Sequence, residues 1–205
     1  MTAITVMAGR DAAWIMADRA WFTSDGTLDL IQPKIVVYQR LLAAIAVAGQ
    51  VSNQAHGLIG AWLRGRKGQD EAIGRLPDLF DILLQNVRNE PDQLRLFMVI
   101  WSTARNQAEA HILKGDGKSV VQVRACASPP TDAPVPERLS DHAAAVAFIE
   151  GQRRWQFPGG CRIGGAVDLV TITASGMTGE IIHRWPDRIG EPIAIQPARH
   201  RARES

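Results

Sequence analysis

The sequence has little cysteine, no long apolar run and little net charge, and each shortage argues against a class of protein. Cys126 and Cys161 are the only two cysteines among 205 residues. They are too few for a disulfide framework, so we expect a reducing compartment. No stretch reaches 18 consecutive apolar residues, so we expect no membrane span and no membrane partner. The formal net charge of +2 at pH 7 requires no nucleic-acid partner.

The sequence also lacks the motifs that are typical of metal-binding and nucleotide-binding sites. The five histidines show no metal-ligand spacing, so we expect no metal and no cofactor. The glycine pairs do not form a phosphate-binding loop, so any ATPase that works with this protein would be a separate chain. The first residues lack a basic stretch followed by an apolar one. We therefore expect no signal peptide and a cytoplasmic protein.

What is present is an ordinary globular composition, with 46% hydrophobic residues, which is enough for a sizeable core. We expect residues 1–195 to form one domain. The polar and basic residues 196–205 should be a disordered tail.

The periodicity of apolar residues predicts the order ββββ-αα-βββ-α-ββ. Strands are predicted over 2–8, 12–19, 34–38, 42–48, 94–101, 106–113, 119–126, 166–174 and 179–185. Helices are predicted over 51–64, 72–89 and 141–155. This order is typical of an α+β fold, and two antiparallel sheets packed face to face with helices outside would accommodate it.

Two helix ends carry more specific predictions. Pro77 could occupy the first position of a shorter helix, where proline is tolerated. Ser140 is the expected N-cap of the helix over 141–155. In that helix, the side chains expected to face the core are those of Ala144, Val146, Ala147 and Phe148.

Three polar residues near the start of the chain are evenly spaced. Thr2 follows Met1, Asp18 lies 16 residues later, and Lys34 another 16 residues later. Removal of Met1 would leave a hydroxyl and a free α-amine on Thr2, so that nucleophile and base share one residue. An aspartate and a lysine are the groups that such a site needs.

Each of these residues also has an ordinary interpretation. Thr2 could begin an edge strand with Met1 retained. Asp18 could be a turn residue paired with Arg19 or Arg10, and Lys34 could be a surface lysine at the start of a strand. Taken singly, the ordinary interpretations are favoured, whereas the joint spacing favours a catalytic site.

The first 50 residues resemble proteasome β-subunits and the related bacterial two-ring peptidase, which are N-terminal-nucleophile hydrolases. The matching stretches are Thr2-Ala3-Ile4, AAWIMAD ending at Asp18, Lys34-Ile35, and AAIAVAG ending at Gly49. Later, GGAVDLVTIT and GEIIHRW resemble the last strand pair of that family. The resemblance implies a four-layer α-β-β-α sandwich of two antiparallel sheets flanked by helices.

The resemblance also implies roles for five residues. Thr2 would be the nucleophile and its own α-amine the base. Lys34 would favour the alkoxide, and Asp18 would pair with Lys34 and hold it in place. An amide near Gly49 would stabilise the oxyanion. Ser128 could stand in for a serine that supports the terminal amine.

The sequence departs from the family before its second glycine pair. Relatives often carry Asp-x-x-Ser or Asp-x-x-Thr there, to support the terminal amine. Here Gly160 and Ile163 would replace the aspartate and the serine before Gly164-Gly165. Ala3 also stands where many relatives carry a second threonine.

The leading hypothesis is a threonine-type peptidase that cleaves peptides or unfolded proteins. The resemblance implies a homo-oligomeric ring, with a separate ATPase as a possible partner. Apolar helix residues would be available for contacts between subunits: Trp62, Leu63, Phe80 and Leu84. Two alternatives stay open, a catalytically weak or inactive assembly subunit and an amidase that acts on a small molecule.

Overall fold

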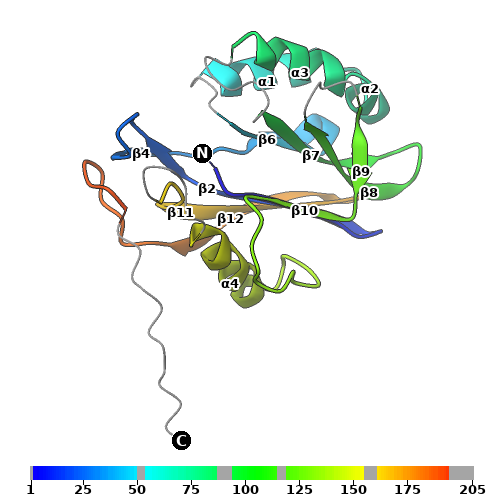
Figure 1. The fold of residues 1–205 in the computed structure, drawn as a ribbon. Helices are drawn as coiled ribbons and strands as arrows, with labels where there is room; N and C mark the ends of the chain where they lie inside the picture. Colours follow the sequence, from blue (N-terminus) through cyan, green and yellow to red (C-terminus); the bar gives the residue numbers. More distant parts are fainter. Residues whose placement is uncertain (1, 50–53, 87–93, 115–118, 155–160, 194–205) are drawn as a thin grey trace, which may run out of the picture.

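The computed structural model describes residues 2–49, 54–86, 94–114, 119–154 and 161–193 (Figure 1). Met1 and the predicted tail, residues 196–205, lie outside this part of the chain. The described strands are β1 (Ile4–Ala8), β2 (Ala12–Asp18), β3 (Ala20–Phe22), β4 (Leu28–Ile31), β5 (Val36–Tyr38), β6 (Ala43–Ala48), β7 (Arg95–Ser102), β8 (Gln107–Lys114), β9 (Val121–Val123), β10 (Ala125–Ser128), β11 (Ala166–Thr173) and β12 (Gly176–Arg184). The described helices are α1 (Gln54–Arg64), α2 (Gln69–Gly74), α3 (Leu76–Leu84) and α4 (His142–Arg153), with a 3-10 turn at Gln39–Leu41.

The strands form two five-stranded sheets and one hairpin. One sheet has the order β10-β1-β2-β11-β12, the other has the order β5-β6-β7-β8-β9, and β3 pairs with β4. All the recorded pairings between these strands are antiparallel. The predicted α+β class with antiparallel sheets is confirmed.

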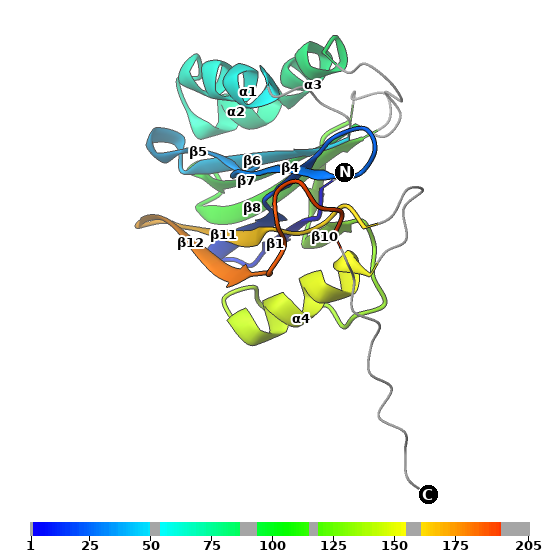
Figure 2. The same ribbon diagram turned by 90° about the vertical axis from the view of Figure 1, so that its left-hand side faces the viewer.

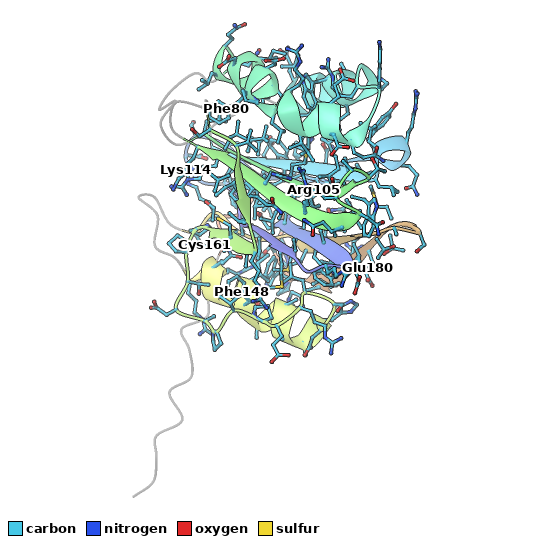
Figure 3. All side chains as sticks on the ribbon, turned by 90° about the vertical axis from the view of Figure 1, so that its right-hand side faces the viewer. Phe80, Arg105, Lys114, Phe148, Cys161 and Glu180 are labelled. Carbon is cyan, nitrogen blue, oxygen red and sulfur yellow. The ribbon has the colours of Figure 1, made fainter. Side chains whose placement is uncertain are left out.

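Helices cover the outer faces of the two sheets, and the inner faces pack together (Figure 2). Because side chains alternate along a strand, β7 contributes to two cores. Met98 packs with α1 and α3, whereas its neighbour Val99 packs between the sheets. Figure 3 shows Phe80 of α3 and Phe148 of α4 on opposite sides of the sheets.

The helix predicted over 72–89 is wrong in its bounds, because the chain forms two helices, α2 and α3, that meet at Arg75. Pro77 lies in the first turn of α3, where its missing N–H has no helical partner to lose. The proline therefore belongs to a helix start, although Leu76, and not Pro77, takes the predicted first position.

The N-cap prediction for α4 is wrong by one residue. Asp141 caps this helix, because its carboxylate accepts a hydrogen bond from the Ala144 amide at 3.1 Å. The predicted core face is also wrong except at Phe148. The fully buried apolar side chains of α4 are those of Ala145, Phe148 and Ile149.

The single strand predicted over 119–126 is two strands in different sheets. β9 pairs with β8, and β10 pairs with β1, so the chain passes from one sheet to the other at Arg124. This crossing carries Ser128 to a position opposite Ile4 on β1. The hairpin of β3 and β4 was not predicted.

The helix residues expected to contact other subunits are part of the core. The side chains of Trp62, Leu63 and Phe80 are buried against the outer face of one sheet, and Leu84 packs beside them. The expectation that they are available for subunit contacts is therefore wrong for Trp62, Leu63 and Phe80. No helix in the described part of the chain is long and apolar enough to cross a membrane.

Candidate active site

Asp18 is the centre of a buried polar cluster at the end of β2. Its carboxylate, 0% exposed, accepts hydrogen bonds from the amides of Ala3 at 2.8 Å, Ala20 at 3.1 Å and Gly164 at 3.3 Å. The Lys34 ammonium donates to the same carboxylate from 3.0 and 3.1 Å. This network leaves the interpretation of Asp18 as a simple turn residue without support.

Arg19, one of the ordinary partners considered for Asp18, binds another carboxylate. Its Nε lies 2.9 Å from Asp168 Oδ2 on β11. Asp18 instead uses its two oxygens for backbone amides and one lysine. A buried carboxylate with this many donors is held in a single orientation.

Lys34 is a buried lysine, only 4% exposed. Burial lowers its pKa, while the charge of Asp18 and the hydrogen bond to it act in the opposite direction. The ammonium also lies 5.8 Å from the centre of the Trp21 ring. The interpretation of Lys34 as a surface lysine is therefore excluded by its burial.

Thr2 is buried immediately before β1, next to the Asp18 cluster. The amide of Ala3 donates to Asp18 Oδ1, and the carbonyl of Ala3 accepts from the Asp18 amide at 3.2 Å. Both backbone groups of the residue after Thr2 are thus fixed by Asp18. Alternation along β1 places Thr2 on the side of Ile4, which faces the other sheet.

Gly49 follows the last residue of β6 with a backbone φ of +125°. L-amino acids rarely adopt this conformation, so the position favours glycine. The neighbouring residue Ala48 pairs with Arg95 on β7. Gly49 therefore lies at the end of the sheet where β7 begins.

Ser128 is the last residue of β10, and its hydroxyl oxygen accepts a hydrogen bond from Arg95 Nη1 at 2.9 Å. This contact joins the two sheets at the end where β6 leads into Gly49. Sequence reasoning missed Arg95, because the two partners are 33 residues apart and belong to different sheets.

The second glycine pair lies between two carboxylates. The Gly164 amide donates to Asp18, and the Gly165 amide donates to Asp187 Oδ2 at 2.8 Å. Asp187 is itself held by two hydrogen bonds from the buried Arg153 guanidinium, at 2.9 and 2.6 Å. The sequence did not point to Asp187, which follows the last strand.

The residues predicted to replace the family's Asp-x-x-Ser pattern have different outcomes. Gly160 lies outside the described residues. Ile163 is fully buried in the apolar core beneath α4. No polar side chain therefore comes from position 163.

His56 on α1 is a further site neighbour that sequence reasoning did not find. Its ring packs edge-on against Trp21, with 5.4 Å between the ring centres. Burial lowers its pKa; a hydrogen bond with the Lys34 backbone opposes this shift, and the Lys34 charge adds to it. The imidazole is therefore neutral near pH 7 beside the candidate site. Within the described residues, no group of three or more acidic, histidine or cysteine side chains could hold a metal ion.

Comparisons with known proteins show a likeness of fold without a likeness of sequence. No protein-family model matches the chain, and no curated protein matches it. Its structure is similar to that of Anbu (ancestral beta-subunit) from Yersinia bercovieri, with a TM-score of 0.63 and 10% sequence identity. The match covers 88% of this chain and 86% of that chain. The fold is therefore of the proteasome-like type.

Proposed function

We propose that this protein is a threonine-type N-terminal-nucleophile hydrolase with Thr2 as its nucleophile. The observation that carries the proposal is the buried Asp18–Lys34 pair, which also binds the backbone of the residue after Thr2. An ordinary strand start needs no buried ammonium beside it, since burying a charge is costly. The proteasome-like fold supports the same proposal. We propose further that this fold is a four-layer α-β-β-α sandwich.

The proposed reaction begins with removal of Met1, which frees the α-amine of Thr2. Thr2 Oγ attacks an amide carbonyl, and its proton passes to the α-amine directly or through one water. The amide near Gly49 stabilises the oxyanion. The C–N bond then breaks, the leaving amine takes the proton from the ammonium, and water hydrolyses the ester on Thr2.

Lys34 and Asp18 assist this attack without giving up a proton. The ammonium of Lys34 stabilises the developing alkoxide, because opposite charges attract strongly where water is excluded. The carboxylate of Asp18 holds Lys34 and, through the Ala3 amide, the backbone next to the nucleophile. The pair therefore positions both the cation and the chain end.

Intact-mass spectrometry with a peptide β-lactone tests this proposal. We expect the purified protein to lack Met1 and to gain one adduct on Thr2. The Thr2→Ala variant should gain none, whereas Thr178→Ala, at an exposed position on β12, should react like the parent. Retained Met1, or an adduct that survives Thr2→Ala, would contradict the proposal.

Peptides and unfolded proteins are the substrates that we propose, with small acyl-amides as the comparison. A panel of fluorogenic peptides and simple acyl-amides separates a peptidase from a small-molecule amidase. Because the structural neighbour is named a beta-subunit, we also propose that copies of this chain assemble into a ring in the cytoplasm. Analytical ultracentrifugation would detect the ring, and co-purification would detect a separate ATPase.

A second candidate function is that of an assembly subunit with little or no turnover. It is favoured by Ile163, a buried apolar residue where relatives carry a supporting serine or threonine. In that case the protein would assemble normally, and Thr2→Ala would change neither its assembly nor its hydrolysis of the panel. A lower hydrolysis rate in Thr2→Ala than in the parent would exclude this second candidate function.

A further inference from the structure

The contact between Arg95 and Ser128 brings a permanent positive charge to the β1 side of the candidate site. Arg95 Nη1 donates to Ser128 Oγ at 2.9 Å, and Ser128 is buried. A guanidinium stays protonated at any pH at which the protein is folded. The Ser128 hydroxyl therefore has a charged donor on one side and keeps its own proton for another partner.

The strand register places Ser128 near the chain end. Ser128 is opposite Ile4 in the β1–β10 pair, and Thr2 lies two residues before Ile4. Diagonal neighbours on one face of an antiparallel pair have Cα atoms about 7–8 Å apart. One side chain and one water span that separation.

We propose, on the basis of the function proposed above, that Arg95 is a positioning residue that acts through Ser128 to keep the Thr2 α-amine uncharged. A nearby cation disfavours a second positive charge, so the amine takes up a proton less readily. The neutral amine is the form that can accept the proton of the Thr2 hydroxyl. Arg95 would thus favour the neutral amine through its charge.

The other charged and titratable groups around the amine do not cancel this charge. Asp18 on β2 is already paired with Lys34. Lys114 on β8 lies opposite Arg95 in the sheet register and adds a second cation. Burial raises the pKa of Cys126 on β10, so its thiol is neutral, and β6 contains only alanine, isoleucine and valine.

Arg95 gives up no proton in the reaction. The hydroxyl proton of Thr2 moves to the α-amine as the Oγ–C bond forms. The resulting ammonium passes that proton to the departing amine as the C–N bond breaks. The guanidinium only shifts the equilibrium between the protonated and the neutral α-amine before the attack.

The pH dependence of N-terminal acetylation tests this inference without requiring turnover. A removable N-terminal fusion would be cleaved to expose Thr2, and reaction of its amine with acetic anhydride would be followed by mass spectrometry from pH 5 to 9. Because Arg95 is exposed and solvent screens its charge, we expect a modest effect. Arg95→Gln should lower the rate about threefold at acidic pH, and less at high salt.

Two further variants distinguish charge from structure. Arg95→Lys keeps the positive charge and should retain most of the parent's profile, whereas Ser128→Ala should shift the profile in the direction of Arg95→Gln. In the β-lactone reaction, the acidic limb of the rate profile should move to higher pH in Arg95→Gln. A fall in rate at all pH values without such a shift would show a purely structural role and overturn the inference.

Failure of the inference can be separated from failure of the proposed function. If the parent forms the β-lactone adduct and Arg95→Gln leaves the amine profile unchanged, Arg95 does not act on the amine. If the parent forms no adduct but the amine profile shifts in Arg95→Gln, the electrostatic effect holds while the hydrolase proposal fails.

Discussion

The ammonium of Lys34 lies 3.0 and 3.1 Å from the two oxygens of Asp18, and both side chains are buried. The two partners are not equally dependent on each other. Asp18 also accepts three backbone amides, from Ala3, Ala20 and Gly164. Lys34 has Asp18 as the one carboxylate partner recorded among the described residues.

This asymmetry predicts that Asp18→Asn is more destabilising than Lys34→Met. Removing Asp18's charge leaves a buried ammonium without its counter-charge, which costs about 3–5 kcal/mol. Lys34→Met leaves a carboxylate that three amides still stabilise, and methionine fills most of the lysine volume. Urea denaturation of both variants measures the difference. Equal losses, or a larger loss in Lys34→Met, would contradict it.

The same variants separate stability from chemistry. Both should lose most of the β-lactone reaction, because neither keeps a positioned cation beside Thr2. A surface ion pair serves as the control. Arg75 immediately precedes α3, Asp78 lies in its first turn, and both side chains are exposed. Asp78→Asn should change stability by less than about 1 kcal/mol and leave the reaction unchanged.

Local patterns of the sequence were sufficient to predict the parts of the fold that depend on neighbours along the chain. The continuous apolar run of β7, which is buried on both faces, and the helical spacing in α1, which is buried on one face, identify the two kinds of element. The spacing of Asp18 and Lys34 pointed to residues that the structure brings together. Contacts between distant segments have no such local pattern, and this is why Arg95 and Asp187 were missed.

Strand crossings and helix caps were mispredicted for a related reason. A single residue, Arg124, separates β9 from β10, so the sequence reads as one strand although the two halves join different sheets. Ser140 and Asp141 are both good N-caps, and only the geometry of the Ala144 amide distinguishes them. Which sheet a strand joins and which residue caps a helix both depend on tertiary packing.

Gly164 is predicted to tolerate no side chain. A Cβ at this position would overlap the Ile193 side chain and the Asp187 carboxylate. Gly164→Ala should therefore displace the loop that donates to Asp18, lower stability by about 1–3 kcal/mol and slow the β-lactone reaction.

Gly57 on α1 is the matched control for this substitution. An added Cβ there meets no atom within 4 Å. Gly57→Ala should stabilise the protein by about 0.5–1 kcal/mol, because alanine is the better helix former. Thermal unfolding monitored by circular dichroism compares the two variants. If Gly164→Ala unfolds at the same temperature as the parent, the close packing of this loop does not limit stability.

His111 on β8 is predicted to make the fold less stable in mild acid. Burial lowers its pKa, although the hydrogen bond to Glu109 and the charge of Glu109 oppose this shift. Its Nε2 lies 2.8 Å from Glu109 Oε2, and its buried Nδ1 has no partner among the described residues. A carboxylate only accepts hydrogen bonds, so Nε2 carries the proton of the neutral ring.

The sign of the pH effect follows from the unfolded state. An unfolded histidine takes up a proton as the pH falls below about 6.5, while the folded His111 still resists it. Stability is therefore present above pH 6.5 and is lost as the pH falls toward the lower folded pKa, by up to about 1.4 kcal/mol per pH unit.

Urea denaturation between pH 5 and 7.5 measures this contribution. His111→Gln should flatten the decline in stability below pH 6.5. Thr178→Ala, the exposed control on β12 that removes no titratable group, should leave the slope as it is in the parent. An unchanged slope in His111→Gln would show that the buried imidazole does not resist protonation.

Gln152 on α4 is predicted to hold the segment that follows Ser128. Its Nε2 donates to the Pro129 carbonyl at 2.9 Å, and its Oε1 accepts from Thr5 Oγ1 at 3.1 Å. The side chain is fully buried. Gln152→Leu therefore leaves the Pro129 carbonyl without its donor and the Thr5 hydroxyl without its acceptor. We expect a loss of about 1–3 kcal/mol for each unpaired group and a slower β-lactone reaction, because Ser128 precedes the released carbonyl. Gln85→Leu, at an exposed position after α3, should change neither property. A Gln152→Leu protein that is less stable but reacts at the parent's rate would show that α4 supports the fold without supporting the site.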